Sequence, residues 1–202
     1  MKNILLVASK SPSRQMLLKE SGISYQIIEQ NADESACEWG MTLQAVVENI
    51  ALHKMQSVIL PDSKEGDSAY VMTADTMSCD SHGKISGKPI SREDAIEKIK
   101  AAREGARIGT AFCLDKRIFR DGTWSLEKRI QRYVSSEYFF VVPDNWIDRY
   151  LEYSVGFRAS GAIAIEGYGS QFLQKINGSY SAIVGLPMYE LREALDELNF
   201  FD

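Results

Sequence analysis

The sequence has few of the side chains that bind soft metals or form disulfides. It contains two histidines, His53 and His82, at no metal-ligand spacing, which argues against a zinc hydrolase and against a Ser-His triad. The three cysteines, Cys37, Cys79 and Cys113, are odd in number and far apart, which argues against a disulfide framework or a thiolate zinc site. Any bound metal is therefore expected to be a hard cation such as Mg²⁺ or Mn²⁺, held by oxygen atoms.

Long apolar runs and a surplus of basic residues are also missing. No apolar run approaches the length of a membrane span, and the run at residues 4–8 after Lys2 is too short for a signal peptide. The net charge of −5 argues against a non-specific nucleic-acid binder and against a polybasic membrane protein. We expect a cytoplasmic protein that has neither a nucleic-acid nor a membrane partner.

The residues that are present predict an α/β fold. The 202 residues, 45% hydrophobic and 25% charged, suffice for one large domain or two small lobes. Helical patterns and buried-strand patterns alternate at both ends, around two β-rich runs separated by Asp121-Gly122, a hairpin turn signal. No internal repeat or long linker interrupts the chain. The pattern predicts a single domain over residues 1–202, with a mixed twisted sheet, flanking helices and a β-hairpin lobe.

The first strand pattern leads through a short polar turn into a helix. Ser11 stands where an N-cap belongs, Pro12 suits the first helical position, and Gly22 ends the helix. The free N–H groups of the first helical turn, the hydroxyls of Ser9 and Ser11, and the charge of Arg14 would together suit a phosphate. An ordinary capped helix with a surface arginine is the alternative interpretation.

Four further polar residues are candidates for a ligand site. Asp75 follows a strand pattern, and an acidic residue at the carboxyl end of a strand in an α/β fold lies near the crevice where ligands bind. Lys54 is near the end of a predicted helix, where a lysine also simply complements the helix dipole. Glu34 lies in a carboxylate-rich loop that could equally be a solvated turn. Lys88 follows a glycine that permits close approach of the backbone.

Four motifs stand in order along the chain and carry a resemblance. They are Ser9-Lys10-Ser11-Pro12-Ser13-Arg14 within residues 8–18, Ala74-Asp75-Thr76, Gly87-Lys88-Pro89, and Gly178-Ser179-Tyr180 with Gly185-Leu186-Pro187. Together they resemble the Maf family, septum-formation-inhibitor-like nucleotide pyrophosphatases, over essentially the whole chain. The resemblance implies an elongated α/β fold shared with inosine-triphosphate pyrophosphatases and, often, a homodimer. It also implies a metal-dependent cut of a nucleoside triphosphate into monophosphate and pyrophosphate.

The resemblance also implies roles for individual residues. Asp75, Glu34 and Lys88 match catalytic positions, and the two carboxylates would bind Mg²⁺, Mn²⁺ or Co²⁺. The matching substrate-binding positions are Ser9, Arg14, Lys54 and Thr76. The chemistry agrees, because breaking a phosphoanhydride needs cations on the phosphates and an oriented water. Arginine and lysine supply such cations, and a carboxylate can hold the metal or take the proton of the water.

The chain departs from the family pattern at several positions. Ser13 stands where the family has a second arginine beside Arg14, so one phosphate-binding charge is missing. Ala159 replaces a lysine that precedes Ala-Gly-Ala, and Ala182 replaces an asparagine. These losses favour a second hypothesis, a catalytically weakened Maf-like protein that binds nucleotides and acts as a regulator linked to cell division. A P-loop or Rossmann enzyme is disfavoured, because the glycine fingerprint of those folds is missing.

Glu166 bears on the choice of base. In the family, glutamine at this position accompanies pyrimidine nucleotides, whereas Glu-Gly accompanies 7-methyl-GTP. A carboxylate can accept from both N1–H and the 2-amino group of guanine, a pair of donors that uracil and thymine do not offer. The motif Gly178-Ser179-Tyr180, however, resembles the pyrimidine branch. The sequence therefore leaves a 7-methyl-GTP-like and a pyrimidine substrate both open.

Overall fold

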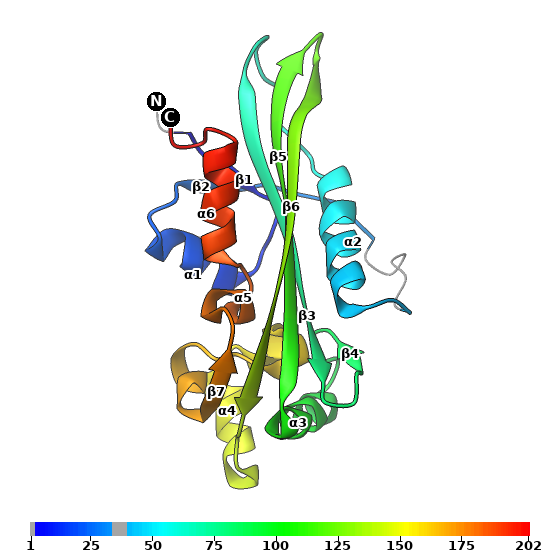
Figure 1. The fold of residues 1–202 in the computed structure, drawn as a ribbon, viewed down its shortest axis with the longest axis vertical. Coiled ribbons are helices and arrows are strands. Elements are labelled where there is room, and N and C mark those ends of the chain that lie inside the picture. Colours follow the sequence, from blue (N-terminus) through cyan, green and yellow to red (C-terminus); the bar gives the residue numbers. More distant parts are fainter. Residues whose placement is uncertain (1–2, 34–39) are drawn as a thin grey trace. The chain divides into compact units, whose positions relative to one another are not determined.

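A computed structural model describes residues 3–33 and 40–202 of the chain. In these residues the strands form one seven-stranded sheet of order β2-β1-β3-β5-β6-β7, with β4 paired to β3 outside this path (Figure 1). The strands are β1 (Leu5–Val7), β2 (Tyr25–Ile27), β3 (Ser68–Asp80), β4 (Ile85–Ser86), β5 (Ala106–Arg120), β6 (Thr123–Phe140) and β7 (Leu173–Asn177). The α-helices are α1 (Pro12–Glu20), α2 (Leu43–Gln56), α3 (Arg92–Ala101), α4 (Ile147–Tyr153), α5 (Tyr180–Val184) and α6 (Met188–Glu197). The predicted mixed α/β class is confirmed.

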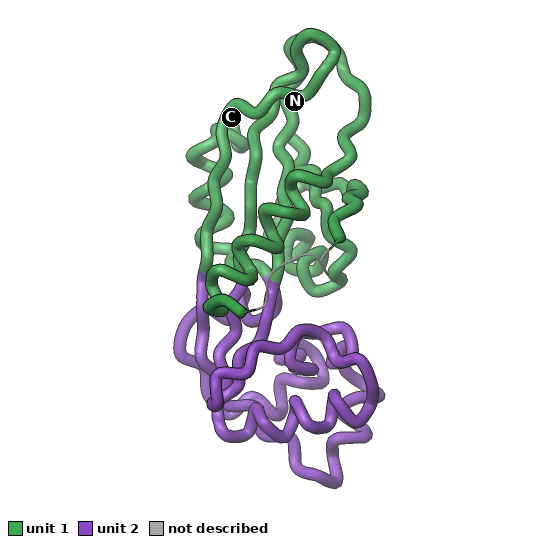
Figure 2. Tube along the Cα trace, turned by 90° about the vertical axis from the view of Figure 1, so that its right-hand side faces the viewer, with its two compact units in different colours: residues 1–75, 111–133, 186–202 green, residues 76–110, 134–185 purple. Residues whose placement is uncertain are grey.

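The chain forms two compact units (Figure 2). Unit 1 comprises residues 1–75, 111–133 and 186–202, and unit 2 comprises residues 76–110 and 134–185. Strands β3, β5 and β6 each contribute residues to both units. A single domain over the whole chain therefore stays a prediction.

Unit 1 is built around the short parallel strands at the start of the chain. Leu5 of β1 pairs with Tyr25 of β2 on one side and with Tyr70 of β3 on the other. Helix α2 covers one face of this sheet, while α1 and α6 cover the other (Figure 1). Leu5 and Val7 are therefore completely buried, as expected for a continuous apolar run in a sheet that helices cover on both faces.

Local signals in unit 1 place the start of α1 and the long turn where the sequence predicts them, and a similar cap begins α2. The hydroxyl of Ser11 accepts a hydrogen bond from the N–H of Arg14, and Thr42 caps α2 in the same way. Between β5 and β6 the chain turns at Asp121 and Gly122, whose φ angles are +51° and +74°. Two left-handed residues are typical of the tight turn that Asp-Gly favours, so the predicted hairpin is confirmed.

The core of unit 2 is aromatic. The ring centroid of Tyr150 on α4 lies 5.3 Å from that of Phe140 and 5.8 Å from that of Phe172, both in edge-to-face contacts. Trp146 also packs against Phe172, with a centroid distance of 6.1 Å. Such contacts add to the stabilisation that comes from area burial, so they fix α4 against β6 and the glycine-rich segment that follows.

Asp144 lies three residues before α4 but does not cap this helix. A 3₁₀ turn, Asp144–Trp146, precedes α4, and Trp146 rather than Asp144 occupies the N-cap position. The Asp144 carboxylate instead accepts a hydrogen bond from Arg103 and lies 3.8 Å from the ammonium of Lys100. The hydrogen bond from Arg103 holds the pKa of Asp144 below its usual value.

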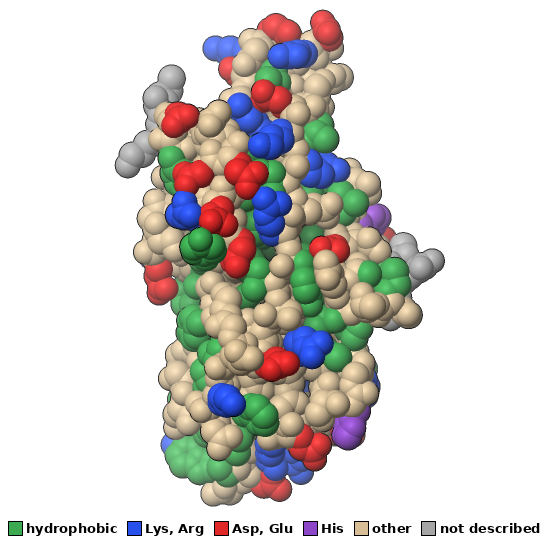
Figure 3. Space-filling model, viewed as in Figure 1, with side chains coloured by type: hydrophobic (Ala, Val, Ile, Leu, Met, Phe, Trp, Pro, Cys, Tyr) green, Lys and Arg blue, Asp and Glu red, His purple; other side chains and the backbone are tan. Residues whose placement is uncertain are grey.

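Charged side chains of both signs alternate over α6 and the neighbouring part of β6 (Figure 3). Glu197 pairs with Arg132 at 2.8 Å and lies 3.9 Å from Lys128, while Arg192 pairs with Asp196 along the helix. These pairs are about half exposed, so each contributes less than about 1 kcal/mol to stability. In the described residues no helix is both long and apolar enough to cross a membrane.

Candidate functional site

The turn between β1 and α1 brings Ser9 and Arg14 together. The Arg14 guanidinium donates to the Ser9 hydroxyl at 3.0 Å, and the backbone N–H of Ser11 donates to the same oxygen at 3.4 Å. Arg14 is only 8% exposed, which excludes the alternative of an ordinary surface arginine. A buried cation, a hydroxyl and a positive helix end thus meet in one short loop of unit 1, an arrangement suited to an anion.

Lys54 and Asp75 form a buried ion pair. The Lys54 ammonium lies 2.8 Å from Oδ1 of Asp75, and the two side chains are 11% and 9% exposed. Taking both charges out of water costs several kcal/mol per ion, and hydrophobic residues of the same volume would often be no less stable. A pair of this kind is therefore weak evidence for stability and favours a functional role for the two charges.

The expectation that Asp75 ends its strand is wrong. Strand β3 continues to Asp80, and Asp75 lies inside it. The reason is the change of partner along β3. The pairing with β1 ends at Met72, opposite Val7, whereas β3 continues beside β5 and then pairs with β4 at Ser78. Asp75 thus lies beyond the carboxyl end of the parallel pair, the place from which α/β folds bind ligands.

The predicted metal ligands are the carboxylates of Asp75 and Glu34. Glu34 lies outside the described residues. In the described part of the chain no three His, Cys, Asp or Glu side chains are grouped as a metal site. Asp75 alone still fits a hard cation, because Mg²⁺ in phosphate-transfer sites is usually held by one or two carboxylates, water and the phosphates of the substrate.

The other predicted residues belong to unit 2, where Thr76 joins a chain of hydroxyl groups. Thr76 Oγ1 lies 2.9 Å from Thr110 Oγ1, and Thr110 in turn donates to the carbonyl of Ala182 on α5 at 2.8 Å. Either hydroxyl could be the donor between Thr76 and Thr110, and the Thr76 hydroxyl also lies 3.5 Å from the carbonyl of Gly185. This network ties the start of the unit 2 part of β3 to the helix that follows the Gly178-Ser179 turn.

Residues 160–161 donate hydrogen bonds to the loop that carries Lys88. The N–H of Gly161 donates to the carbonyl of Gly87 at 3.0 Å, and the Ser160 hydroxyl donates to Ser86 at 3.2 Å. The Lys88 side chain itself is exposed, while its carbonyl accepts from Lys98 at 3.3 Å. The segment in which the family lysine is lost therefore supports the loop of Lys88 directly.

Glu166 is half-buried and stands in a rigid turn. The Tyr150 hydroxyl donates to the carbonyl of Ala162 at 2.8 Å and accepts from the N–H of Ala164 at 2.7 Å. Burial raises the pKa of Tyr150, so this hydroxyl keeps its proton at neutral pH. Gly169 closes the turn with a bond to the Glu166 carbonyl, and a Cβ at Gly169 would lie 1.7 Å from the Ala164 oxygen. Three hydrogen bonds thus hold the backbone on both sides of Glu166.

Sequence reasoning missed a buried charged cluster in unit 1. Asp115 on β5 is completely buried and accepts hydrogen bonds from Arg117 and from Arg129 on β6. A signal was present in the sequence, since Asp115 and Arg117 are two apart and so share one face of a predicted strand. This signal is weak, because an acidic residue near the end of an apolar run also suits a strand that leaves the core.

Comparisons with known proteins agree with these motifs. A family model described as Maf-like protein matches residues 4–198. A dTTP/UTP pyrophosphatase of Fusobacterium nucleatum subsp. nucleatum is 30% identical, over 97% of this chain and 96% of its own length. A dTTP/UTP pyrophosphatase of Caldicellulosiruptor bescii is 32% identical, over 97% and 95% of the two chains. A nucleoside triphosphate pyrophosphatase of Trichormus variabilis is 29% identical, over 96% and 93%.

Proposed function

The chain belongs to the Maf-like protein family, and we propose that it is a nucleoside triphosphate pyrophosphatase that releases a monophosphate and pyrophosphate. The observation that carries the proposal is the buried pair of Lys54 and Asp75, at 2.8 Å, in the same unit as the Arg14 turn. The names of the relatives favour dTTP and UTP as substrates. Glu166 favours a second candidate, a guanine nucleotide such as 7-methyl-GTP, because a carboxylate suits the two donors of guanine.

The reaction consumes one water. Its oxygen forms a bond to the α-phosphorus, the bond from that phosphorus to the bridging oxygen breaks, and pyrophosphate leaves. Arg14 and Lys54 are proposed to bind phosphate oxygens and to stabilise the charge that develops on them. Ser9 donates a hydroxyl hydrogen bond to the same anion. Asp75 is proposed to orient the water and to take its proton, with its carboxylate held in place by Lys54.

A divalent cation is part of the proposal. Asp75 would hold it, with Glu34 as the predicted second ligand, and Mg²⁺, Mn²⁺ and Co²⁺ are the candidates. When bound, such an ion neutralises phosphate charge and polarises the phosphoryl group. Lys88 and Glu166 of unit 2 are proposed to contact phosphate and base, and Thr76 to contact the substrate.

We further propose that the enzyme is a cytoplasmic homodimer. The family resemblance supports the dimer, and the cytoplasmic location is carried over from the sequence as an expectation. Sedimentation of the purified chain tests the first part of this proposal. Fractionation of cells that express it tests the second.

Substitution of Asp75 by asparagine tests the reaction. Asp75→Asn keeps the shape of the side chain and one acceptor for Lys54, so we expect an intact fold and the loss of most turnover. Pyrophosphate release from dTTP, UTP and 7-methyl-GTP is measured with Mg²⁺, Mn²⁺ and Co²⁺, and circular dichroism controls for folding. Near-normal turnover in Asp75→Asn would refute the mechanism. Nucleotide binding without turnover in the native chain would favour the weakened regulatory protein instead.

A further inference from the structure

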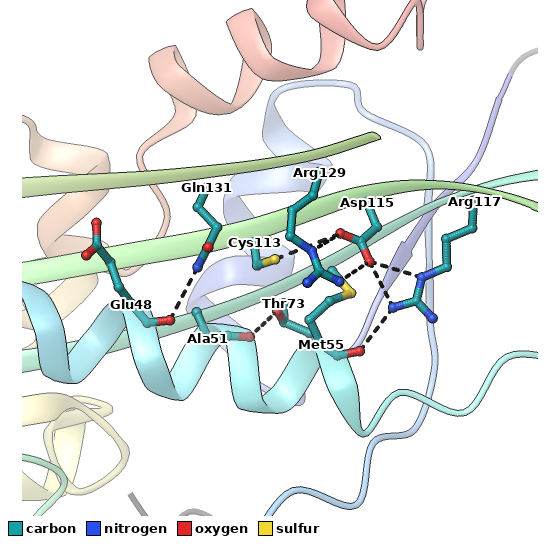
Figure 4. Close-up of polar contacts among 9 residues, drawn as sticks. All are labelled: Glu48, Ala51, Met55, Thr73, Cys113, Asp115, Arg117, Arg129 and Gln131. Carbon is teal, nitrogen blue, oxygen red and sulfur yellow. Dashed lines mark hydrogen bonds and ion pairs between the residues drawn. The ribbon is translucent and has the colours of Figure 1, made fainter. Parts of the chain in front are cut away.

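Side chains from three strands donate to backbone carbonyls of α2 (Figure 4). The carbonyl of Glu48 accepts from Gln131 of β6 at 3.4 Å. The carbonyl of Ala51 accepts from Thr73 of β3 at 2.7 Å, and that of Met55 accepts from Arg117 of β5 at 3.1 Å. Positions 48, 51 and 55 are three and four residues apart, so the three carbonyls lie along the one face of α2 that packs on the sheet.

Thr73 donates its hydrogen bond to the carbonyl of Ala51, about one helical turn before Lys54 on α2. Thr73 and Asp75 are two apart on β3 and therefore point to the same face of the strand. Ala51 and Lys54 are three apart on α2 and therefore lie on the same side of the helix. The buried hydroxyl of Thr73 and the carboxylate of Asp75 thus reach neighbouring points on α2. The hydroxyl therefore fixes the register of the helix along β3, in addition to the packing of its buried apolar side chains.

Arg117 binds the backbone of α2 one residue beyond Lys54. Helix α2 ends at Gln56, so no later helical N–H can donate a hydrogen bond to the carbonyl of Met55. The Arg117 guanidinium donates to this carbonyl instead. Arg117 is itself held by two hydrogen bonds to Oδ2 of Asp115, at 3.0 and 2.8 Å. Its positive charge also suits the negative end of the helix dipole. The last turn of α2, which carries Lys54, is thus fixed by a group that cannot move independently.

We propose that Thr73 and Arg117 are positioning residues for Lys54, holding α2 so that the Lys54 ammonium meets Asp75. The proposal rests on the proposed function for its consequence in catalysis, but not for its structural content. A long lysine side chain has many rotamers, and the contact with Asp75 does not by itself define where α2 lies. The two hydrogen bonds to the backbone on either side of Lys54 restrict the position of α2 before substrate binds, as preorganisation of a catalytic group requires.

Thr73→Val tests the proposal with little change of shape. The carbonyl of Ala51 keeps its helical bond, so folding is retained, and we expect kcat to fall about tenfold or more with KM little changed, because small misplacements of reacting groups are costly. Thr73→Ser keeps the hydroxyl and should restore the rate. A second variant, Arg117→Gln, removes the bond at Met55 while Arg129 still pairs with Asp115. Arg117→Gln should also lower kcat with little change in KM.

A readout independent of turnover is the reactivity of Lys54. Competitive labelling with acetic anhydride, which reacts with neutral amines, followed by mass spectrometry, reports how accessible the buried amino group of Lys54 is to the reagent. We expect labelling of Lys54 to rise several-fold in Thr73→Val and in Arg117→Gln, relative to the half-exposed Lys100 in the same sample. Gln131→Leu is the matched control, because its longer bond ends six residues before Lys54, and it should change neither labelling nor rate.

The outcomes separate the positioning role from the reaction. Unchanged labelling of Lys54 in both variants would overturn the proposal, whatever the turnover. Increased labelling of Lys54 in both variants, in a protein whose native form hydrolyses no triphosphate, would uphold the positioning and reject the proposed function. A lower kcat in Thr73→Val that Thr73→Ser does not restore would also count against it, since the hydroxyl would then not be the cause.

Discussion

The buried carboxylate of Asp115 offers a direct test of how the charged cluster acts on stability. Its side chain is completely inaccessible, and two guanidinium groups donate four hydrogen bonds to it at distances of 2.7 to 3.0 Å. Arg117 uses Oδ2 alone, whereas Arg129 uses both oxygens. The perturbation is Asp115→Asn, which preserves the volume of the side chain and removes its charge.

The structure sets the size of the expected effect. Asparagine has one acceptor oxygen, so if it occupies the Oδ2 position, the amide nitrogen faces the Nε–H of Arg129 and that bond is lost. The remaining three bonds lose the charge of their acceptor, and two mostly buried guanidiniums then lie near each other without an anion. Breaking a buried pair in this way costs about 3–5 kcal/mol. For a chain of this size that corresponds to a fall of about 10 °C in Tm.

Urea and thermal unfolding, followed by circular dichroism, measure the loss. Asp196→Asn is the matched control, because its partner Arg192 is half exposed and the pair should contribute less than about 1 kcal/mol. A triple change of Asp115 to leucine with Arg117 and Arg129 to methionine should recover much of the stability, since apolar residues often replace buried ions without loss. A change below about 1 kcal/mol in Asp115→Asn would show that the reasoning about the cluster is wrong.

Three further predictions concern unit 2. Lys88→Ala should lower kcat/KM for the best triphosphate by one to several powers of ten, on the order of 2–4 kcal/mol as for other charge-stabilising groups, and an unchanged value would remove Lys88 from the site. Glu166→Gln should shift the ratio of kcat/KM for 7-methyl-GTP and UTP toward UTP, because an amide can donate to a ring carbonyl of the pyrimidine and accept from its N3–H. A constant ratio would mean that Glu166 does not contact the base. Tyr150→Phe should lower the free energy of unfolding, measured in urea, by roughly 2 kcal/mol, because the buried carbonyl of Ala162 and the buried N–H of Ala164 lose their partner. A loss below about 0.5 kcal/mol would show that water replaces the hydroxyl.

Local rules predicted much of the fold because the forces behind them act within a few residues. Ser11 and Thr42 cap their helices through hydrogen bonds to N–H groups three residues on, which the amino-acid order alone specifies. Asp121 and Gly122 tolerate left-handed backbone, so the position of the long hairpin turn followed from two letters of sequence. Asp144 shows the limit of such rules, because a cation from another element, Arg103, takes the carboxylate away from the helix.

The sequence by itself determined the α/β class, the family motifs and the identity of most candidate residues. What only the tertiary structure decided is which of them meet. It paired Lys54 with Asp75 across 21 residues, buried Arg14 against Ser9, and placed Asp75 inside a long strand rather than at its end. Thr73 and the Asp115 cluster gained significance only when α2 was laid on the sheet, because burial and a partner from another strand give a side chain its energetic weight, and neither is a property of its neighbours in sequence.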